Sequence, residues 1–226
     1  MIYTDNDRRV LQDRFEKELI RRVYVKLYTS RINCRTCGVA AEWLVETAKL
    51  NKLIVPSQAD YETEPDEMAK VRVVNFPVVS VRQKKAEQPN IFYYGVPSGR
   101  QSIEFLHMLV WSSRRRVPIQ AASAGYVAEV GSESNIVAYV IPTCHHSQKM
   151  VSTLYKAAVM NSNIQLSVID ALAFPQLAKM AGVREFPYVF MNDRIHIIGN
   201  KPEEEVMYLL QESSRPVIEL ASRSVA

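Results

Sequence analysis

The chain has 226 residues, of which 47% are hydrophobic and 23% are charged, with a formal net charge of +4 at pH 7. This composition is ordinary for one or two globular domains, and so modest a charge does not require a nucleic-acid partner. No run of about 18 apolar residues marks a transmembrane helix, and residues 1–18 are too polar for a signal segment. We therefore expect a soluble cytoplasmic protein that binds neither membrane nor nucleic acid.

The first half of the chain is predicted to alternate helices with strands. Leu11, Phe15 and Leu19 recur at four-residue spacing and predict an amphipathic helix over 5–20, while alternating Val and Tyr predict a strand over 22–30. The later elements follow in order: a helix at 39–50, a strand at 52–55, a short helix at 65–70, strands at 78–81 and 91–94, and a closing amphipathic helix.

The second half is predicted to repeat this order. Its elements are a strand at 135–141, a helix at 150–160, a strand at 164–169, a short helix at 174–181, strands at 188–191 and 195–198, and a closing helix. Residues 118–134, rich in Ala, Ser and Gly, are interpreted as a connector with one short helix. We therefore divide the chain into an N-terminal unit, 1–117, and a C-terminal unit, 118–226.

The strongest pattern is a repeated pairing of a cysteine with a proline. Cys34 precedes Pro77 by 43 residues, Cys144 precedes Pro187 by the same distance, and the two pairs are offset by 110 residues. Agreement at both ends of so long a span indicates two copies of one unit. Each copy places a thiol after a strand and opposite a proline.

The first cysteine turn, Cys34-Arg35-Thr36-Cys37, has the spacing of a dithiol. In thiol–disulfide exchange one thiolate attacks a disulfide and a second thiol must reach back to release the product. We expect both thiols to lie at helix amino termini, with Cys34 exposed and Cys37 sheltered. The helix dipole and Arg35 would then stabilise the thiolate. Cys34 is the predicted nucleophile and Cys37 the predicted resolving thiol.

The second turn, Cys144-His145-His146-Ser147, has a serine where a resolving cysteine would stand. Cys144 can therefore act at most as a monothiol, whose pKa an imidazolium of His145 or His146 would lower. The alternative is that this copy is a scaffold or a surface on which substrates dock.

Each cysteine is followed by a Phe-Pro pair, Phe76-Pro77 and Phe186-Pro187. Few X-Pro bonds are cis in folded proteins, but repetition at a fixed distance from a cysteine favours cis prolines here. Such a loop would turn its backbone toward the thiol, so that an extended peptide substrate could pair with it.

Other kinds of site have less support in the sequence. A Cys-x-x-Cys pair can bind zinc, but the nearest further Cys/His cluster begins 107 residues beyond Cys37. There is no glycine-rich phosphate loop. The basic run at 114–116 is interpreted as charge at a helix end. We expect neither a metal nor a cofactor other than a redox-active Cys34–Cys37 disulfide.

The whole chain resembles the archaeal and bacterial protein disulfide oxidoreductases, which are two-unit, glutaredoxin-like relatives of protein disulfide isomerase. The resemblance is most specific in the segment Ile91 to Gly99 and in Asn135 to Cys144 with its Pro142-Thr143-Cys144 ending. It implies an α/β fold of two tandem thioredoxin-like units, each a central mixed β-sheet flanked by helices.

The resemblance also assigns roles to residues. It maps the family's dithiol onto Cys34 and Cys37, its second nucleophile onto Cys144, and its cis prolines onto Pro77 and Pro187. Protein or peptide thiols and disulfides are the implied substrates, and a thioredoxin-reductase-like protein is a candidate electron donor.

The sequence departs from this family in two places. Ser147 removes the second dithiol, and the strands that lead to the thiols contain no carboxylate to accept a proton, so Glu42 or Glu46 is a candidate base. The preferred interpretation is a thiol–disulfide oxidoreductase with a degenerate second unit. The alternatives are a client-binding module, or a protein that binds metal or an iron–sulfur cluster through exposed cysteines.

Overall fold

The computed structural model describes residues 2–32 and 34–215. Its first half contains α1 (Asp5–Glu18), β1 (Val23–Thr29), α2 (Cys37–Ala48), β2 (Ile54–Asp60), α3 (Pro65–Val71), β3 (Val78–Arg82), β4 (Ile91–Tyr94) and α4 (Gly99–Arg114). Its second half contains α5 (Ala121–Ala128), β5 (Ser134–Val140), α6 (His145–Met160), β6 (Ile164–Asp170), α7 (Pro175–Met180), β7 (Tyr188–Met191), β8 (Ile195–Ile198) and α8 (Glu203–Ser214).

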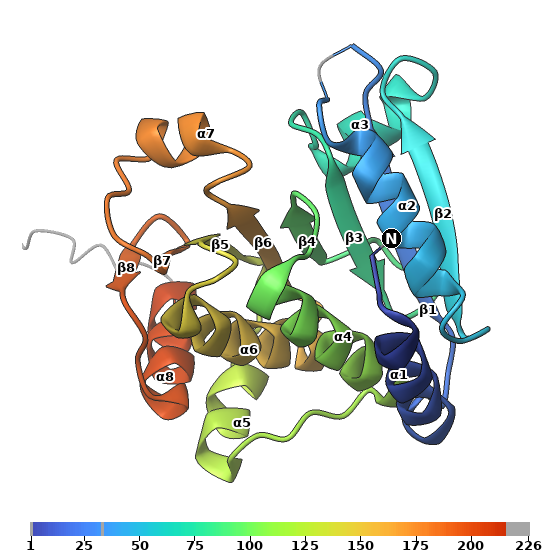
Figure 1. The fold of residues 1–226 in the computed structure, drawn as a ribbon. Coiled ribbons are helices and arrows are strands. Elements are labelled where there is room, and N and C mark those ends of the chain that lie inside the picture. Colours follow the sequence, from blue (N-terminus) through green and yellow to red (C-terminus); the bar gives the residue numbers. More distant parts are fainter. Residues whose placement is uncertain (1, 33, 216–226) are drawn as a thin grey trace, which may run out of the picture.

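The strands form one eight-stranded mixed sheet in the order β2-β1-β3-β4-β6-β5-β7-β8 (Figure 1). Within each half the pattern is the same: β1 and β5 pair in parallel with β2 and β6, and antiparallel with β3 and β7. The halves join where β4 pairs in parallel with β6. The predicted fold class, two tandem α/β units with mixed sheets flanked by helices, is confirmed.

Alternating side chains of β1 divide the interior into layers. Val23, Val25 and Leu27 belong to the large core that the helices α1, α2 and α4 cover, whereas Tyr28 belongs to a smaller cluster under α3. This division follows from the two-residue period of a strand. The large core also includes Tyr155 of α6, so it is continuous across both units.

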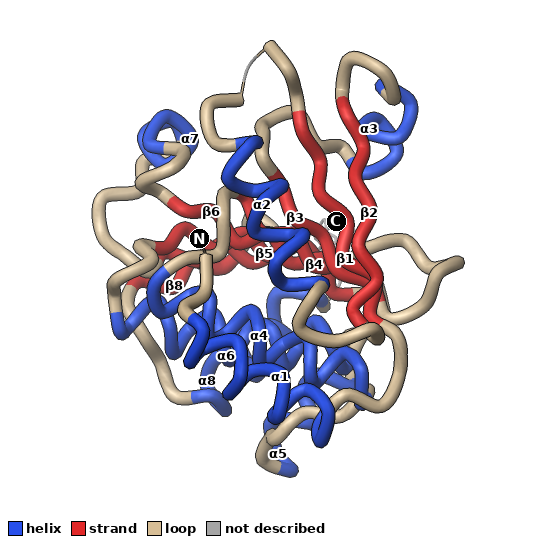
Figure 2. Tube along the Cα trace, turned by 45° about the vertical axis from the view of Figure 1, so that its right-hand side comes forward, coloured by secondary structure: helices blue, strands red, loops and turns tan. Residues whose placement is uncertain are grey.

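All the strands that lead toward the candidate sites point to one edge of the sheet. Since β1, β4, β6 and β5 run in the same direction, their carboxyl ends lie together at that edge. In Figures 1 and 2 the short helices α3 and α7 stand above the same edge. The two cysteine turns, which follow β1 and β5, therefore lie on one side of the molecule.

Several predicted boundaries are wrong. The strand predicted at 52–55 is β2, which runs from Ile54 to Asp60 because its parallel pairing with β1 continues for seven residues. Pro56 has no backbone N–H to donate to a neighbouring strand, and β2 tolerates it because β2 lies at the edge of the sheet. The helix predicted at 150–160 begins earlier, at His145, and the connector contains the one short helix expected, α5.

Among the described helices, none combines the length and apolar character that crossing a membrane requires.

Candidate redox site

The structure joins Cys34 and Cys37 in a disulfide with an S–S distance of 2.03 Å and a Cα–Cα distance of 5.5 Å. Cys34 lies in the loop after β1, and Cys37 is the first residue of α2. The thiols were expected at helix amino termini, and Cys37 lies there, whereas Cys34 comes two residues before the N-cap residue Thr36. Both cysteines are half-buried, so Cys34 is less exposed than expected.

The remaining predicted residues of this site lie around the disulfide. Arg35 is exposed between the two cysteines, and the peptide bond between Phe76 and Pro77 is cis. Phe76 belongs to the same small apolar cluster as Tyr28, against which both cysteines pack. Its ring centroid is 5.6 Å from that of Tyr61.

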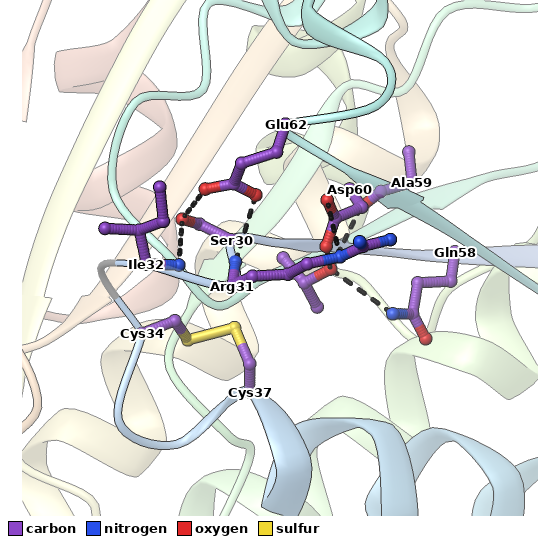
Figure 3. The surroundings of a disulfide bond; sticks show 10 residues. Ser30, Arg31, Ile32, Cys34, Cys37, Gln58, Ala59, Asp60 and Glu62 are labelled. Carbon is purple, nitrogen blue, oxygen red and sulfur yellow. Dashed lines mark hydrogen bonds and ion pairs between the residues drawn. A yellow bond between two sulfur atoms is a disulfide. The ribbon is translucent and has the colours of Figure 1, made fainter.

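The loop that carries Cys34 is fixed by a carboxylate that the sequence did not point to (Figure 3). Glu62, just beyond β2, accepts hydrogen bonds from the Ser30 hydroxyl at 2.5 Å and from the Arg31 backbone N–H at 3.0 Å. These bonds, that from Ser30 above all, lower the pKa of Glu62 from 4.5 to about 2. Glu62 therefore stays ionised at neutral pH and ties the loop to the end of β2.

Asp60 strengthens the same connection. Its carboxylate lies 3.4 Å from the Arg31 guanidinium and accepts a hydrogen bond from the Thr29 hydroxyl at 3.3 Å. The corresponding residue of the second unit, 110 positions later, is Asp170, which accepts the backbone N–H of Leu172 at 2.9 Å. Asp60 and Asp170 are separated by the same 110 residues as Cys34 and Cys144. The repeat could therefore have identified both carboxylates from the sequence.

Lys26 of β1 takes part in a partly buried ion pair. The Lys26 ammonium lies 2.7 Å from the Glu67 carboxylate of α3 and 5.6 Å from the centroid of the Tyr28 ring. The hydrogen bond from Lys26 is the main reason that the pKa of Glu67 is lowered. Two acidic residues, Asp60 and Glu67, thus contact a strand that has no carboxylate of its own, at its carboxyl end and at its middle.

The two candidate bases on α2 differ in what surrounds them. Glu46 pairs with Arg8 at 2.5 Å and with Lys49 at 2.9 Å, and the hydrogen bond from Lys49 lowers its pKa. A carboxylate so paired is a weaker proton acceptor. Glu42 is exposed on the same helix.

In the second unit Cys144 is the N-cap residue of α6 and is a free, half-buried thiol. His145 and His146 are exposed, and Ser147 is fully buried, with its hydroxyl oxygen accepting the Ile141 N–H at 3.3 Å.

The pKa of Cys144 is lower than its ordinary value. Burial raises this pKa, but hydrogen bonds from Ser147 and from the His146 backbone, with the charge of Arg100, outweigh that effect. Arg100 belongs to α4 of the first unit, a contribution that sequence spacing did not reveal.

The proline of the second unit also follows the prediction, since the Phe186–Pro187 bond is cis. Phe186 packs against a cluster of its own, with Tyr139 and Ile169. Within residues 2–32 and 34–215, no three His, Cys, Asp or Glu side chains are grouped so as to hold a metal ion.

Comparison with known proteins agrees with this geometry. Residues 135–211 match the thioredoxin-domain family. The N-terminal domain of alkylhydroperoxide reductase AhpF from Enterococcus faecalis superposes with a TM-score of 0.83 at 20% identity, over 92% of this chain and 99% of that one. A protein disulfide oxidoreductase from Aeropyrum pernix gives 0.82 at 18% identity, over 93% of each chain.

The structural likeness shows a thioredoxin-type fold for both halves of the chain, and the first half carries the Cys34–Cys37 disulfide. The expected resemblance to the protein disulfide oxidoreductases is confirmed at the level of the fold.

Curated relatives match a shorter stretch. A protein named NADH dehydrogenase from Bacillus subtilis is 23% identical over 121 residues, and one of the same name from Ferdinandcohnia aciditolerans is 22% identical over 124. These stretches are 54% and 55% of this chain, but only 24% of each relative's length.

Proposed function

We propose that the protein exchanges disulfides with protein substrates through Cys34 and Cys37, with Cys144 as an accessory monothiol. The observation that carries the proposal is the disulfide across Cys34 and Cys37 at the end of β1, beside the Phe76–Pro77 loop. The thioredoxin-type fold of both units supports it.

The exchange has two balanced steps. In the reduced protein the Cys34 thiolate attacks one sulfur of the substrate disulfide, which forms a mixed disulfide and releases the other substrate sulfur as a thiolate. The Cys37 thiolate then attacks the Cys34 sulfur and releases the second substrate thiolate. The substrate gains two electrons and the protein is left with the Cys34–Cys37 disulfide; run in reverse, the same steps oxidise a dithiol.

The loop before Pro77 offers a way to align the substrate. Within the described residues, no backbone hydrogen bond joins Val74, Asn75 or Phe76 to another residue, and Val74 is 74% exposed. Backbone N–H and C=O groups that no other described residue engages in this way allow an extended peptide to pair with the segment. We propose the same role for Phe186 and Pro187 in the second unit.

Electrons would come from a thioredoxin-reductase-like donor in the cytoplasm. Support for such a partner comes from the relatives named NADH dehydrogenase, in which the matching stretch is part of a longer chain. Reoxidation of NADH or NADPH in a mixture of donor, this protein and a protein disulfide would test the coupling. No reoxidation with any such donor would remove this partner from the proposal.

The two cysteines have distinguishable roles that substitution tests. We expect Cys34→Ser to abolish reduction of a protein disulfide such as insulin, and Cys37→Ser to accumulate a mixed disulfide between Cys34 and the substrate, detected by mass spectrometry. Cys144→Ser is the matched control and should still reduce insulin, because the Cys34–Cys37 pair remains. Failure of Cys37→Ser to trap any substrate, with wild-type turnover present, would contradict these roles.

A further inference from the structure

A groove of about 960 Å³ lies beside the disulfide, and both units line it. One wall comes from the first unit and includes Ile32, Cys34 and Val74. The other wall, called the α7 wall below, comes from the second unit and extends from Leu172, which precedes α7, to Met180 at the end of that helix. Figures 1 and 2 both place α7 on the same edge of the sheet as the loop after β1.

Four of the side chains that line this groove are large, apolar and exposed. Ile32 is 78% exposed, Val74 74%, Leu172 65% and Met180 83%, and all four line the groove. Single exposed hydrophobic residues need no explanation, but a cluster around one opening marks a binding surface. Water leaves such a surface readily when an apolar group covers it.

The charge of the residues that line the groove indicates which kind of substrate it can bind. Arg35 is the one charged residue among the described residues that line the groove, and it lies between the two cysteines. A small, highly charged disulfide would meet this cation but would leave the α7 wall uncovered. A polypeptide segment with a large apolar side chain near its cysteine covers both walls, and a carboxylate beside that cysteine would meet Arg35.

The second wall is held in place by a buried carboxylate. Asp170, at the end of β6, accepts the backbone N–H groups of Leu172 at 2.9 Å and Ala173 at 3.3 Å. The segment with which this wall begins, Leu172 and Ala173, is therefore held in place before any substrate binds. Such preorganisation lowers the entropic cost of binding.

We propose that this groove binds an extended segment of the substrate protein and selects a large apolar side chain near the substrate cysteine, which lies against Leu172 and Met180. The second unit, which lacks a resolving cysteine, thereby supplies substrate specificity to the disulfide of the first. This inference rests on the proposed exchange at Cys34.

Two peptide disulfides that differ only in Phe or Ser beside the cysteine test the proposal. We expect kcat/KM of the wild type to be at least about tenfold higher for the Phe peptide. In the double variant Leu172→Gln, Met180→Gln this ratio should fall toward one, mainly through KM. Both side chains are exposed, so the variant should fold normally, which far-UV circular dichroism and Tm would verify.

Binding is measured separately with fluorescein-labelled peptides in which Ser replaces Cys. The double variant should bind the Phe peptide about tenfold more weakly than the wild type does. The control pair Met160→Gln, Ile198→Gln removes apolar side chains that are 39% and 50% exposed outside the groove, and it should bind as the wild type does.

The outcomes separate the two proposals. Equal affinity of the wild type and the groove variant for the Phe peptide would overturn the groove proposal, as would equal wild-type kcat/KM for the two peptides. Binding that depends on Phe and on the α7 wall, with no turnover of any disulfide, would instead reject the exchange reaction and retain the groove as a client-binding site.

Discussion

Ser147 shows how one substitution changes the chemistry open to the second unit. Its hydroxyl occupies the position of a resolving thiol, so no internal disulfide can form with Cys144. The same hydroxyl, fully buried at the start of α6, accepts the Ile141 N–H and is among the groups that lower the pKa of Cys144. The residue that prevents resolution therefore also helps to keep the remaining thiol reactive.

We expect Ser147→Ala to raise the pKa of Cys144 and to slow its alkylation near neutral pH. The removed hydroxyl no longer donates a hydrogen bond to the thiolate, while the burial that raises this pKa remains. The rate of iodoacetamide labelling against pH, with Cys34 and Cys37 held as the disulfide, measures the change. Ser162→Ala, on the exposed turn after α6, is the control. An unchanged pH profile in Ser147→Ala would show that the hydroxyl does not act on the thiol.

The loop between β1 and α2 depends on contacts that reach across the sheet. Glu62 ties Ser30 and Arg31 to the end of β2, and so fixes the chain just before Cys34. Because the pKa of Glu62 falls from 4.5 to about 2, its contribution to stability is present above pH 4.5. That contribution is lost as the pH falls through 2.

We expect Glu62→Gln to reduce stability at pH 6 and to differ from the wild type by less than half as much at pH 3. The glutamine carries no charge to be hydrogen-bonded, so the variant lacks this part of the pH dependence. Urea unfolding midpoints at the two pH values measure the difference. The control is Glu64→Gln, the N-cap residue of α3, whose side chain makes no capping bond. A difference between wild type and Glu62→Gln that is the same at both pH values would contradict this account.

Local sequence patterns predicted most elements but not the contacts between them. The helix α1 was predicted because apolar spacing is a local signal, and in the structure Thr4 starts this helix by forming a capping box with Asp7. The end of β2 was missed because Ser57, Gln58 and Asp60 are polar, and only pairing with β1 makes them a strand.

The candidate sites also contain some features that local sequence patterns predicted and others that they did not. The disulfide and the two Phe-Pro loops were predicted, because cysteine and proline spacing survives in the chain as a repeat. Arg100 and the α7 wall of the groove were not, since each comes from the other unit and no spacing links it to the thiol it adjoins. Long-range proximity of this kind is set by the pairing of β4 with β6.

At the scale of the whole molecule the two units share one interior. Polar side chains cross the junction, with the Asn90 amide donating to the backbone oxygens of Ala158 at 2.8 Å and Ile164 at 3.0 Å. Aromatic rings connect the cores: the Phe105 ring centroid is 5.2 Å from that of Trp43 and 6.4 Å from that of Tyr155. The boundary near residue 118 therefore separates two copies of a sequence repeat that share one hydrophobic core. We expect the two units to unfold together.

Phe105→Ala should destabilise both units at once. The fully buried ring contacts residues of both halves, and its removal should cost about 3–5 kcal/mol through lost burial and a cavity. Fluorescence of Trp43 and Trp111 reports on the first unit and far-UV circular dichroism on both, so the two probes should shift together to one lower urea midpoint. Tyr208→Ala, which removes a partly exposed ring contact within the second unit, should cost about 1 kcal/mol or less. Separation of the two probes, with only the fluorescence transition moving in Phe105→Ala, would instead show that the units unfold independently despite their common sheet.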